Sequence, residues 1–354
     1  MNLQNFRAEI DKIDDEILGL LEKRMEIVKR IGKAKLQSNA PIYRPEREKE
    51  IIDRLSSKGS LLLSKSAIEA IYLEIFAVSR NLELPERVAY LGPLGSYTHQ
   101  AAESRFGAMC EYFSHNTIMQ AVKSVEDGRA SYAVIPVENS QNGSVGETLD
   151  LLRETQLKIV AEIYMPIHHC FASRTHRIQE IEIIYSKDIA FGQCSNFLSE
   201  HSLDHIQRIA VDSTARAVQL AGENPKCAAI CSPIAAKLYN TPILFENIEN
   251  DSDNKTRFIV ISDFKNQPCG RDKTSLCALL ANDDKPGAIY RLLYDIKDLD
   301  INMTLFQSRP KRAGKDFDYC FFIDIDGHID DANVKELFKR YPNELKWLGS
   351  YLKI

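Results

Sequence analysis

Apolar residues recur at alternating intervals of three and four positions along the start of the chain, from Leu3 through Ile17 to Ala34. This spacing places them on one side of an α-helix, and nothing interrupts the pattern before Pro41. A helix of about 35 residues is roughly 50 Å long, which exceeds the width of a small domain. We therefore expect its apolar side to be buried against partners, including a second copy of the chain.

Two shorter helices are predicted to follow. Pro45 is typical of the first turn of a helix, and Ser64 is typical of the residue that caps one. Because no strand pattern occurs among them, residues 1–84 are predicted to form an all-α domain. Arg24 lies on the apolar side of the long helix, and Ser79 interrupts that of the third helix. A buried guanidinium costs several kcal/mol unless an anion pairs with it. Arg24 therefore indicates either an anion-binding pocket or a side chain that reaches solvent or a partner's carboxylate.

Residues 1–84 resemble the all-helical chorismate mutase domain over their full length. The resemblance is carried by Gly32-Lys33-Ala34-Lys35 followed by Pro45-Glu46-Arg47-Glu48. It implies a swapped homodimer of long helices that surround the substrate with cations. By position, it also implies a site made of Arg7 (from the other chain), Arg24, Lys35, Arg47, Glu48, Ser79 and Glu83.

The chemistry of chorismate mutase suits these residue types. A Claisen rearrangement needs a compact conformer of the substrate and stabilisation of the charge that develops on its ether oxygen. The arginines would bind the two carboxylates of chorismate, and Lys35 and Glu83 would face the ether oxygen. Two positions depart from the family, because Arg44 stands where many relatives have an acid and Glu83 where some have glutamine.

After Pro85 the pattern changes to alternating strands, loops and helices. The predicted strands are Arg87–Leu91, Tyr132–Val137, Ile209–Val211 and Ala228–Ile230, and a helix follows each one. Such units build a parallel or mixed α/β sheet whose loops line a cleft at the carboxyl ends of the strands. The glycine-containing loops do not match a nucleotide-binding fingerprint.

Two pairs of polar residues adjoin apolar strands in this part of the chain. Glu138 and Asn139 follow one strand, and Thr256 and Arg257 precede the apolar run Phe258–Ile261. A hydroxyl donor beside a permanent cation is suited to hold a small organic anion and to pass it a proton. From these residues alone, an ordinary strand residue beside a surface charge is the favoured interpretation.

Residues 87–265 resemble prephenate dehydratase, an enzyme that removes carbon dioxide and hydroxide from prephenate to give phenylpyruvate. The matching stretches are Tyr90–Thr98, Pro136–Ser140, Tyr185-Ser186, Gln193-Cys194 and Thr256-Arg257-Phe258. The resemblance implies two α/β lobes around a cleft, as in periplasmic binding proteins, and no cofactor. Thr256 would contact the leaving hydroxyl, with water or Glu138 as a proton relay. The remaining substrate-binding residues that it implies are Asn139, Ser186, Gln193, Arg257 and Phe258.

The last part of the chain, residues 272–354, follows the short linker Gln267–Gly270. Its pattern predicts the order strand, helix, strand, strand, helix, strand, which is the ferredoxin-like βαββαβ plait. It resembles the amino-acid-binding ACT regulatory domain in Pro286-Gly287-Ala288-Ile289-Tyr290 and in Gln307-Ser308-Arg309-Pro310, where glutamine replaces the usual glutamate. The resemblance implies that Gly287, Ala288 and Ile289 belong to the regulatory site together with the second stretch. The resemblance implies feedback inhibition by L-phenylalanine.

Composition excludes several other classes of protein. A length of 354 residues suggests two or three domains, and the net charge of −5 gives no field that would attract nucleic acid. The eight cysteines form no C-x-x-C pair, and His168-His169 lacks a metal-binding motif, so we expect no metal and no cofactor. A charged N-terminus and the lack of a long apolar run predict a cytoplasmic protein with no membrane partner.

The whole chain therefore resembles the bifunctional chorismate mutase/prephenate dehydratases of phenylalanine biosynthesis. Its expected ligands are chorismate, prephenate and L-phenylalanine, and its expected assembly is a homodimer or a larger homo-oligomer. Two alternatives remain open. One is a monofunctional dehydratase with a helical dimerisation arm, and the other is a non-catalytic metabolite sensor.

Overall fold

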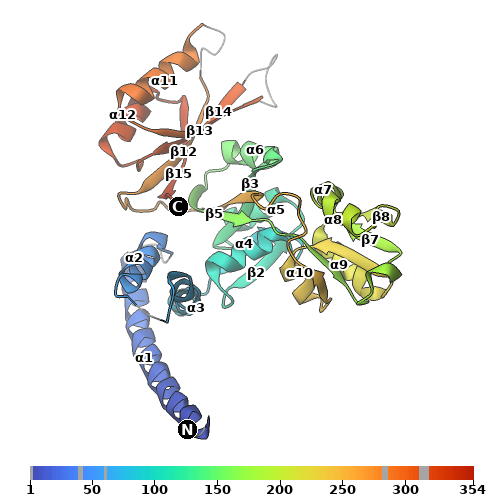
Figure 1. Ribbon diagram of the computed structural model, residues 1–354. Coiled ribbons are helices and arrows are strands. Elements are labelled where there is room, and N and C mark those ends of the chain that lie inside the picture. The colour runs from blue at the N-terminus through green and yellow to red at the C-terminus, as the bar shows by residue number, and fades with distance from the viewer. Residues whose placement is uncertain (1–2, 39–42, 60–61, 281–285, 311–318) are drawn as a thin grey trace. The chain divides into compact units, whose positions relative to one another are not determined.

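The computed structural model describes residues 3–38, 43–59, 62–280, 286–310 and 319–354 (Figure 1). The chain divides into two compact units. The helical unit contains Met1–Glu86 together with Phe106–Glu111, and the α/β unit contains Arg87–Arg105 and Tyr112–Ile354. Phe106–Glu111 lies far from the helices in sequence, so its place in the helical unit was not predicted.

The three predicted helices of the first unit are confirmed as α1 (Leu3–Ser38), α2 (Pro45–Ser56) and α3 (Lys65–Glu83). Ser64 caps α3 as predicted, because its side chain accepts a hydrogen bond from the backbone N–H of Ala67. Gly32 lets α1 approach α3 closely, since a Cβ atom at this position would lie 3.1 Å from Cα of Glu83. The two helices are therefore fixed against each other near the end of α1.

The apolar side of α1 is exposed in the single chain. Leu20 is 65% exposed and Ile10 is 56% exposed. The buried cluster of this unit is small and consists of Ile52, Ile68 and Phe76. An exposed apolar stripe along a helix of this length is typical of a protein–protein interface.

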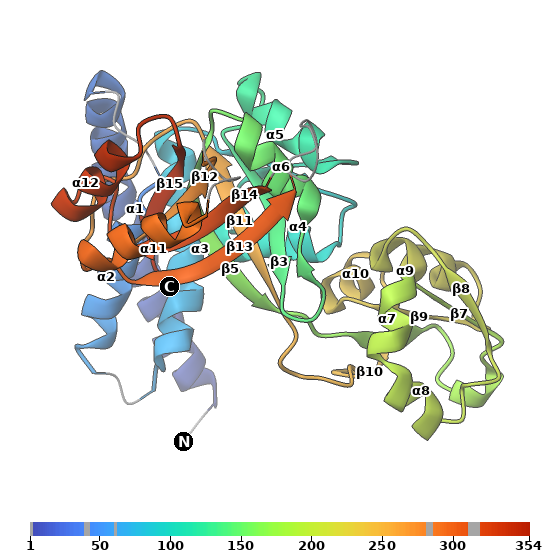
Figure 2. The same cartoon turned by 90° about the horizontal axis from the view of Figure 1, so that it is seen from above.

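The first lobe of the α/β unit is a mixed sheet with the strand order β2-β1-β3-β11-β5, and β4 pairs with β3. β11 is antiparallel to both of its neighbours, β3 and β5, between which it runs in Figure 2. The elements of this lobe are β1 (Arg87–Leu91), α4 (Tyr97–Phe106), β2 (Glu111–His115), α5 (Ile118–Glu126), β3 (Tyr132–Asn139), β4 (Gly143–Ser144), α6 (Gly146–Glu154), β5 (Lys158–Pro166) and β11 (Lys255–Ser262).

The chain leaves the first lobe after β5, builds the second lobe, and returns as β11. The sheet of the second lobe has the order β10-β6-β9-β7-β8. Its elements are β6 (Cys170–Ser173), η1 (Ile178–Glu180), β7 (Ile183–Ser186), α7 (Asp188–Gln193), α8 (Ser195–Glu200), β8 (Gln207–Ala210), α9 (Thr214–Glu223), β9 (Cys227–Cys231), α10 (Pro233–Leu238) and β10 (Ile243–Phe245). The prediction of two α/β lobes is thus confirmed.

The C-terminal sheet has the order β13-β14-β12-β15. Its elements are β12 (Asp272–Ala278), α11 (Ala288–Asp298), β13 (Met303–Pro310), β14 (Tyr319–Asp326), α12 (Ala332–Arg340) and β15 (Leu345–Leu352), in the predicted order. Leu292 of α11 and Leu337 of α12 lie in the core cluster on one face of this sheet.

The opposite face of the C-terminal sheet shares a core with the first lobe. Phe322 and Tyr351 belong to the same buried cluster as Ile135, Ile159 and Ile259. Residues 87–265 and 272–354 therefore pack as one compact unit, although the sequence suggested a domain boundary between them.

Candidate active sites

Lys35 and Glu83 form an ion pair in the helical unit. Nζ of Lys35 donates to Oε2 of Glu83 at 2.7 Å. The pair joins the end of α1 to the last residue of α3, where Gly32 allows the close approach of the helices. The structure therefore brings together the two side chains that were expected to face the ether oxygen of chorismate.

Arg24 and Ser79 meet between the same two helices. Nη1 of Arg24 donates to Oγ of Ser79 at 2.5 Å, and the guanidinium lies 5.9 Å from the centre of the Phe76 ring. Burial lowers the pKa of Arg24 from its ordinary value. The negative charge of Glu83 acts in the opposite direction and favours the charged form of Arg24. A half-buried guanidinium that donates to a neutral hydroxyl is suited to bind an anionic ligand.

Within one chain, three of the predicted mutase residues do not join the Lys35–Glu83 and Arg24–Ser79 pairs. They are Arg7, Arg47 and Glu48. Arg7 is exposed on α1. Arg47 forms an exposed ion pair with Glu50 at 2.8 Å. Glu48 accepts a hydrogen bond from Nη1 of Arg80, a buried residue that the sequence analysis did not select.

In the α/β unit, Asn139 and Thr256 face each other at the end of β3 and the start of β11. Nδ2 of Asn139 donates to Oγ1 of Thr256 at 2.9 Å and to Oδ1 of Asn254 at 2.8 Å. The strand register pairs the two residues directly. The structure therefore joins these two predicted site residues, and it adds Asn254 to them.

The orientation of the Asn139 amide is fixed by its other end. Its Oδ1 accepts hydrogen bonds from the backbone N–H groups of Gln141 and Asn142 at 3.1 and 3.0 Å. Backbone N–H groups can only donate, so the opposite end of the amide must be the NH₂ group. The oxygen of Thr256 therefore accepts, and the hydroxyl hydrogen of Thr256 remains able to donate to a further group.

A chain of hydrogen bonds connects this region to Gln193 of the second lobe. Nε2 of Gln141 donates to the carboxylate of Asp251 at 3.1 Å, and Nε2 of Gln193 donates to Oε1 of Gln141 at 2.9 Å. Oε1 of Gln193 then lies 3.0 Å from Nε2 of His169, and Nδ1 of His169 lies 2.9 Å from the hydroxyl of Tyr97.

The Asp251 carboxylate lies at one end of this series of hydrogen bonds and determines which group donates in each bond. Because Asp251 accepts, each amide must donate toward Asp251 and accept from the other side. Nε2 of His169 therefore carries a hydrogen. The Tyr97 hydroxyl has two acceptors within reach, the backbone carbonyl oxygen of His168 at 2.8 Å and Nδ1 of His169 at 2.9 Å. Burial lowers the pKa of His169 and raises that of Tyr97 well above its ordinary value, which agrees with a neutral imidazole beside a neutral phenol.

Ser186 and Phe258, which were expected to bind the substrate, have buried side chains. Oγ of Ser186 donates to the carbonyl oxygen of Ile230 at 2.8 Å, and its side chain is fully buried. Phe258 is 2% exposed. In this structure both residues support the packing of their lobes.

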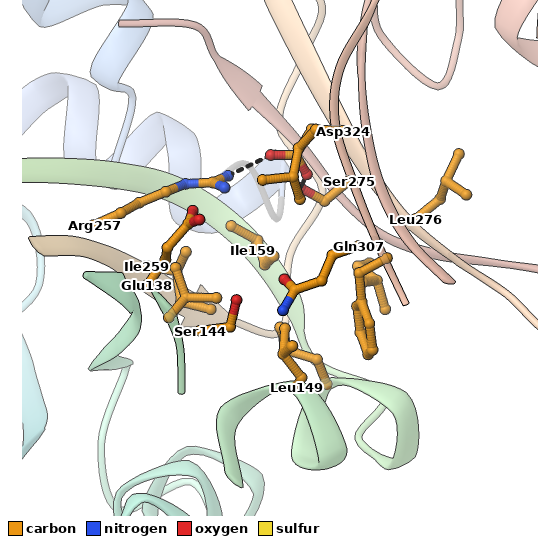
Figure 3. A pocket seen from close by; sticks show the side chains of 15 residues that line it. Glu138, Ser144, Leu149, Ile159, Arg257, Ile259, Ser275, Leu276, Gln307 and Asp324 are labelled. Atoms are coloured by element: carbon orange, nitrogen blue, oxygen red, sulfur yellow. Dashed lines mark hydrogen bonds and ion pairs between the residues drawn. The ribbon is translucent and has the colours of Figure 1, made fainter. Parts of the chain in front are cut away.

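Arg257 and Glu138 lie on the opposite face of the sheet from Thr256 and Asn139. Nε of Arg257 donates to Glu162 at 3.0 Å, and Nη2 lies 2.7 Å from Oδ2 of Asp324 in the C-terminal sheet (Figure 3). Burial acts to lower the pKa of Arg257, but its acidic neighbours raise it beyond the ordinary value. The interpretation of Thr256 and Arg257 as a donor and cation at one site is therefore not supported, because consecutive strand residues point to opposite faces.

Glu138 faces a narrow cavity that Ser144, Arg257, Gln307 and Asp324 also line (Figure 3). A relay from Glu138 to Thr256 would have to cross the sheet, so the structure does not support that role for Glu138. Gln307 reaches this cavity from the C-terminal sheet.

The two parts of the expected regulatory site lie on different faces of the C-terminal sheet. Gly287 precedes α11 with a φ of 89°, and Ala288 and Ile289 begin this helix, which packs on the face away from the first lobe. Gln307 and Arg309 face the first lobe instead. Arg309 binds Asp150 of α6 through Nε and Nη2 at 2.6 and 2.7 Å.

The other residues of that element, Ser308 and Pro310, are exposed. A Cβ atom at Gly146 would lie 2.5 Å from the Arg309 guanidinium, so glycine makes room for the ion pair with Asp150.

The sequence analysis missed Tyr97, His169, Gln141 and Arg80. Tyr97 lies within a stretch that carried the dehydratase resemblance, and His169 was considered only as a metal ligand. Both residues become relevant through contacts between the lobes, which local patterns do not reveal. Among the described residues, no group of three or more His, Cys, Asp or Glu side chains is placed to hold a metal ion. Within the same ranges, no helix is long and apolar enough to span a membrane.

The two units correspond to two enzyme classes. Residues 6–84 match the family "Chorismate mutase type II", and residues 88–266 match the family "Prephenate dehydratase". The chain is thus an enzyme with a chorismate mutase domain and a prephenate dehydratase domain.

Relatives match over nearly the whole chain. A "Bifunctional chorismate mutase/prephenate dehydratase" from Aquifex aeolicus is 40% identical over 99% of this chain and 98% of the relative. One from Neisseria gonorrhoeae is 37% identical over 98% of this chain and 95% of the relative. The solved structure of an Arthrobacter aurescens prephenate dehydratase in complex with L-Phe is 30% identical, covers 75% of this chain and 90% of that chain, and has a TM-score of 0.69. This chain belongs to the family of bifunctional chorismate mutase/prephenate dehydratases.

Proposed function

We propose that the α/β unit converts prephenate to phenylpyruvate at the contact between its two lobes, and that Thr256 is the residue closest to the leaving hydroxyl. The observation that carries this proposal is the bond from the oriented Asn139 amide to the Thr256 oxygen. It directs the hydroxyl hydrogen of Thr256 away from Asn139, toward a bound ligand.

In the proposed reaction, the bond from the ring to the carboxylate breaks and its electron pair enters the ring. The carbon–oxygen bond of the ring hydroxyl then breaks, and hydroxide leaves with a hydrogen bond from Thr256. Aromatisation provides the driving force, so a positioned hydrogen-bond donor is the main requirement. Gln193, which is held by His169 and Gln141, would position the substrate from the second lobe.

We propose that the helical unit is a chorismate mutase that works as a homodimer. The exposed apolar side of α1 supports burial against a second chain. That chain would add its Arg7 to a site formed by Arg24, Lys35, Arg47, Glu48, Ser79 and Glu83, in which Glu48 would contact chorismate. Arg24 and Arg7 would bind carboxylates, and Lys35 would stabilise the charge on the ether oxygen.

We further propose that the C-terminal part is a ferredoxin-like ACT domain through which L-phenylalanine inhibits the dehydratase. The related prephenate dehydratase from Arthrobacter aurescens was solved in complex with L-Phe, which supports the choice of ligand. The bidentate Arg309–Asp150 pair supports a route from the C-terminal sheet to α6, which follows β4 and the strand β3 that ends at Asn139.

One experiment tests these activities together. Purified protein is given chorismate in one assay and prephenate in another, and the formation of prephenate and phenylpyruvate is measured with and without L-phenylalanine. We expect both products, and less phenylpyruvate when L-phenylalanine is present. Phenylpyruvate from prephenate without any turnover of chorismate would favour a monofunctional dehydratase, and no turnover of either substrate would favour a metabolite sensor.

A further inference from the structure

Arg80 is a buried cation that the proposed chemistry does not use. It follows Ser79 on α3 and is 3% exposed. Its guanidinium lies 5.7 Å from the centre of the Tyr43 ring and 5.8 Å from that of Phe106. An arginine enclosed in this way is stable only if its N–H groups find partners.

Three groups accept hydrogen bonds from the guanidinium of Arg80. Nε donates to Oε2 of Glu86 at 2.9 Å, and Nη2 donates to the carbonyl oxygen of Phe106 at 3.0 Å. Nη1 donates to Oε1 of Glu48 on α2. Because the guanidinium is rigid and planar, Glu86 and the Phe106 carbonyl fix the direction in which Nη1 points.

The groups around Arg80 come from two parts of the sequence. One is α3 and the residues that follow it, and the other is the segment Phe106–Glu111. Glu86 follows α3, and its Oε2 also accepts a hydrogen bond from Sγ of Cys110 at 3.3 Å. The backbone N–H of Ala108 donates to Oε2 of Glu74 on α3 at 3.1 Å. Phe106–Glu111 is thereby bound to α3 at several points, so the position of the Phe106 carbonyl is well determined.

The charges also favour a firm link between Arg80 and Glu48. Burial acts to lower the pKa of Arg80, but Glu48 and Glu86 raise it beyond its ordinary value. Burial raises the pKa of Glu86 despite the neighbouring cation. Hydrogen bonds between charged groups are about twice as strong as those between neutral groups, so Arg80 holds Glu48 in one orientation.

We infer that Arg80 is a positioning residue for the mutase reaction, and that Phe106–Glu111 completes the mutase site through it. The inference rests on the proposed mutase function, in which Glu48 contacts chorismate. The path runs from the Phe106 carbonyl and Glu86 to the guanidinium of Arg80, and from there to the Glu48 carboxylate. A segment between α4 and β2 of the dehydratase domain thus supports the other enzyme's site.

The test compares Arg80→Met in the full-length protein with the same change in a Glu48→Gln background. Misplacing a substrate-contacting group by about 1 Å can cost on the order of a hundredfold in rate. We therefore expect Arg80→Met to lower mutase kcat/KM by about tenfold or more, mainly by raising KM for chorismate, and to change dehydratase kcat/KM by less than about twofold. In the Glu48→Gln background, Arg80→Met should have less than about a twofold effect, because residues that act through one another are not additive.

Two further variants complete the design. Arg80→Lys keeps the charge but loses the planar fork, so we expect a folded protein with intermediate mutase activity. Arg54→Met changes an exposed arginine of α2 and should leave both activities unchanged. If Arg80→Met does not fold, Arg80→Lys and its combination with Glu48→Gln decide the question.

Equal losses in both backgrounds, a loss confined to kcat, or wild-type mutase kinetics in a folded Arg80→Lys protein would overturn the inference. A wild-type protein without mutase activity would instead overturn the proposed function. The two failures are therefore distinguishable.

Discussion

Replacing Arg257 with methionine should weaken the attachment of the C-terminal sheet to the first lobe. The guanidinium pairs with Glu162 and Asp324, and Nη2 also donates to the Tyr351 hydroxyl at 2.9 Å. Lys273 would still neutralise Glu162, to which it donates at 2.8 Å. Asp324 would be left as a buried carboxylate that has lost its cation.

The size of the effect follows from that unpaired charge. Removing one partner of a buried ion pair costs about 3–5 kcal/mol. We therefore expect a loss of about that size in the free energy of unfolding of the α/β unit. Adding Asp324→Asn to Arg257→Met should recover part of the loss, because it removes the unpaired charge.

The single tryptophan of the chain provides the assay. Trp347 lies in β15, and Nζ of Lys158 from β5 is 4.9 Å from the centre of its ring. Its fluorescence during urea denaturation should therefore report on the contact between the C-terminal sheet and the first lobe. The control is Arg208→Met, which removes an exposed pair with Asp204 and should change the free energy of unfolding by no more than about 1 kcal/mol.

A particular result would refute this reasoning. If Arg257→Met unfolds at the same urea concentration as the wild type, with the same slope, and yet loses dehydratase activity, Arg257 serves the substrate rather than the contact between the sheets. An equal loss for Arg257→Met and Arg208→Met would also contradict the assignment of a buried ion pair.

Three further predictions concern the activities and their control. Lys35→Ala should abolish mutase turnover and leave dehydratase kcat/KM within about twofold, and Thr256→Ala should do the reverse; loss of both activities from either folded variant would contradict two separate sites. The pKa of His169 is lowered by burial, so the unfolded chain binds a proton more readily and stability should fall as pH drops below the ordinary histidine value of 6.5. His169→Gln should flatten that part of a plot of melting temperature against pH, and an unchanged slope would mean that another group titrates. Arg309→Met should remove the link to Asp150 and weaken inhibition by L-phenylalanine several-fold in a dehydratase assay, whereas unchanged inhibition would exclude this route.

Local signals in the sequence were sufficient for most of the fold. Pro45 in a first helical turn and the capping side chain of Ser64 set helix starts that the structure confirms. These signals work because they concern backbone groups within a few residues of one another. The predicted pairing of Lys35 with Glu83 at one site came from the family resemblance, since 48 positions separate these residues.

The candidate site was harder to predict because it depends on which face of a strand meets which partner. The alternation of β-structure already implies that Thr256 and Arg257 diverge. Only the packing of the C-terminal sheet reveals that the Arg257 side faces Asp324, while the Thr256 side faces Asn139. The polar chain from Asp251 to Tyr97 is likewise assembled from side chains of both lobes, so no local pattern in the sequence indicates it.

The partners of Arg80 have a consequence for how this enzyme can be divided. A cut after residue 84 passes between all three helices of the mutase domain and the rest of the chain, so by helix boundaries alone it is the natural place to divide the protein. It would in fact separate the arginine from Glu86 and from the Phe106 carbonyl, and would leave a buried cation with much of its support removed. An engineer who wants the mutase alone would first have to redesign the position of Arg80.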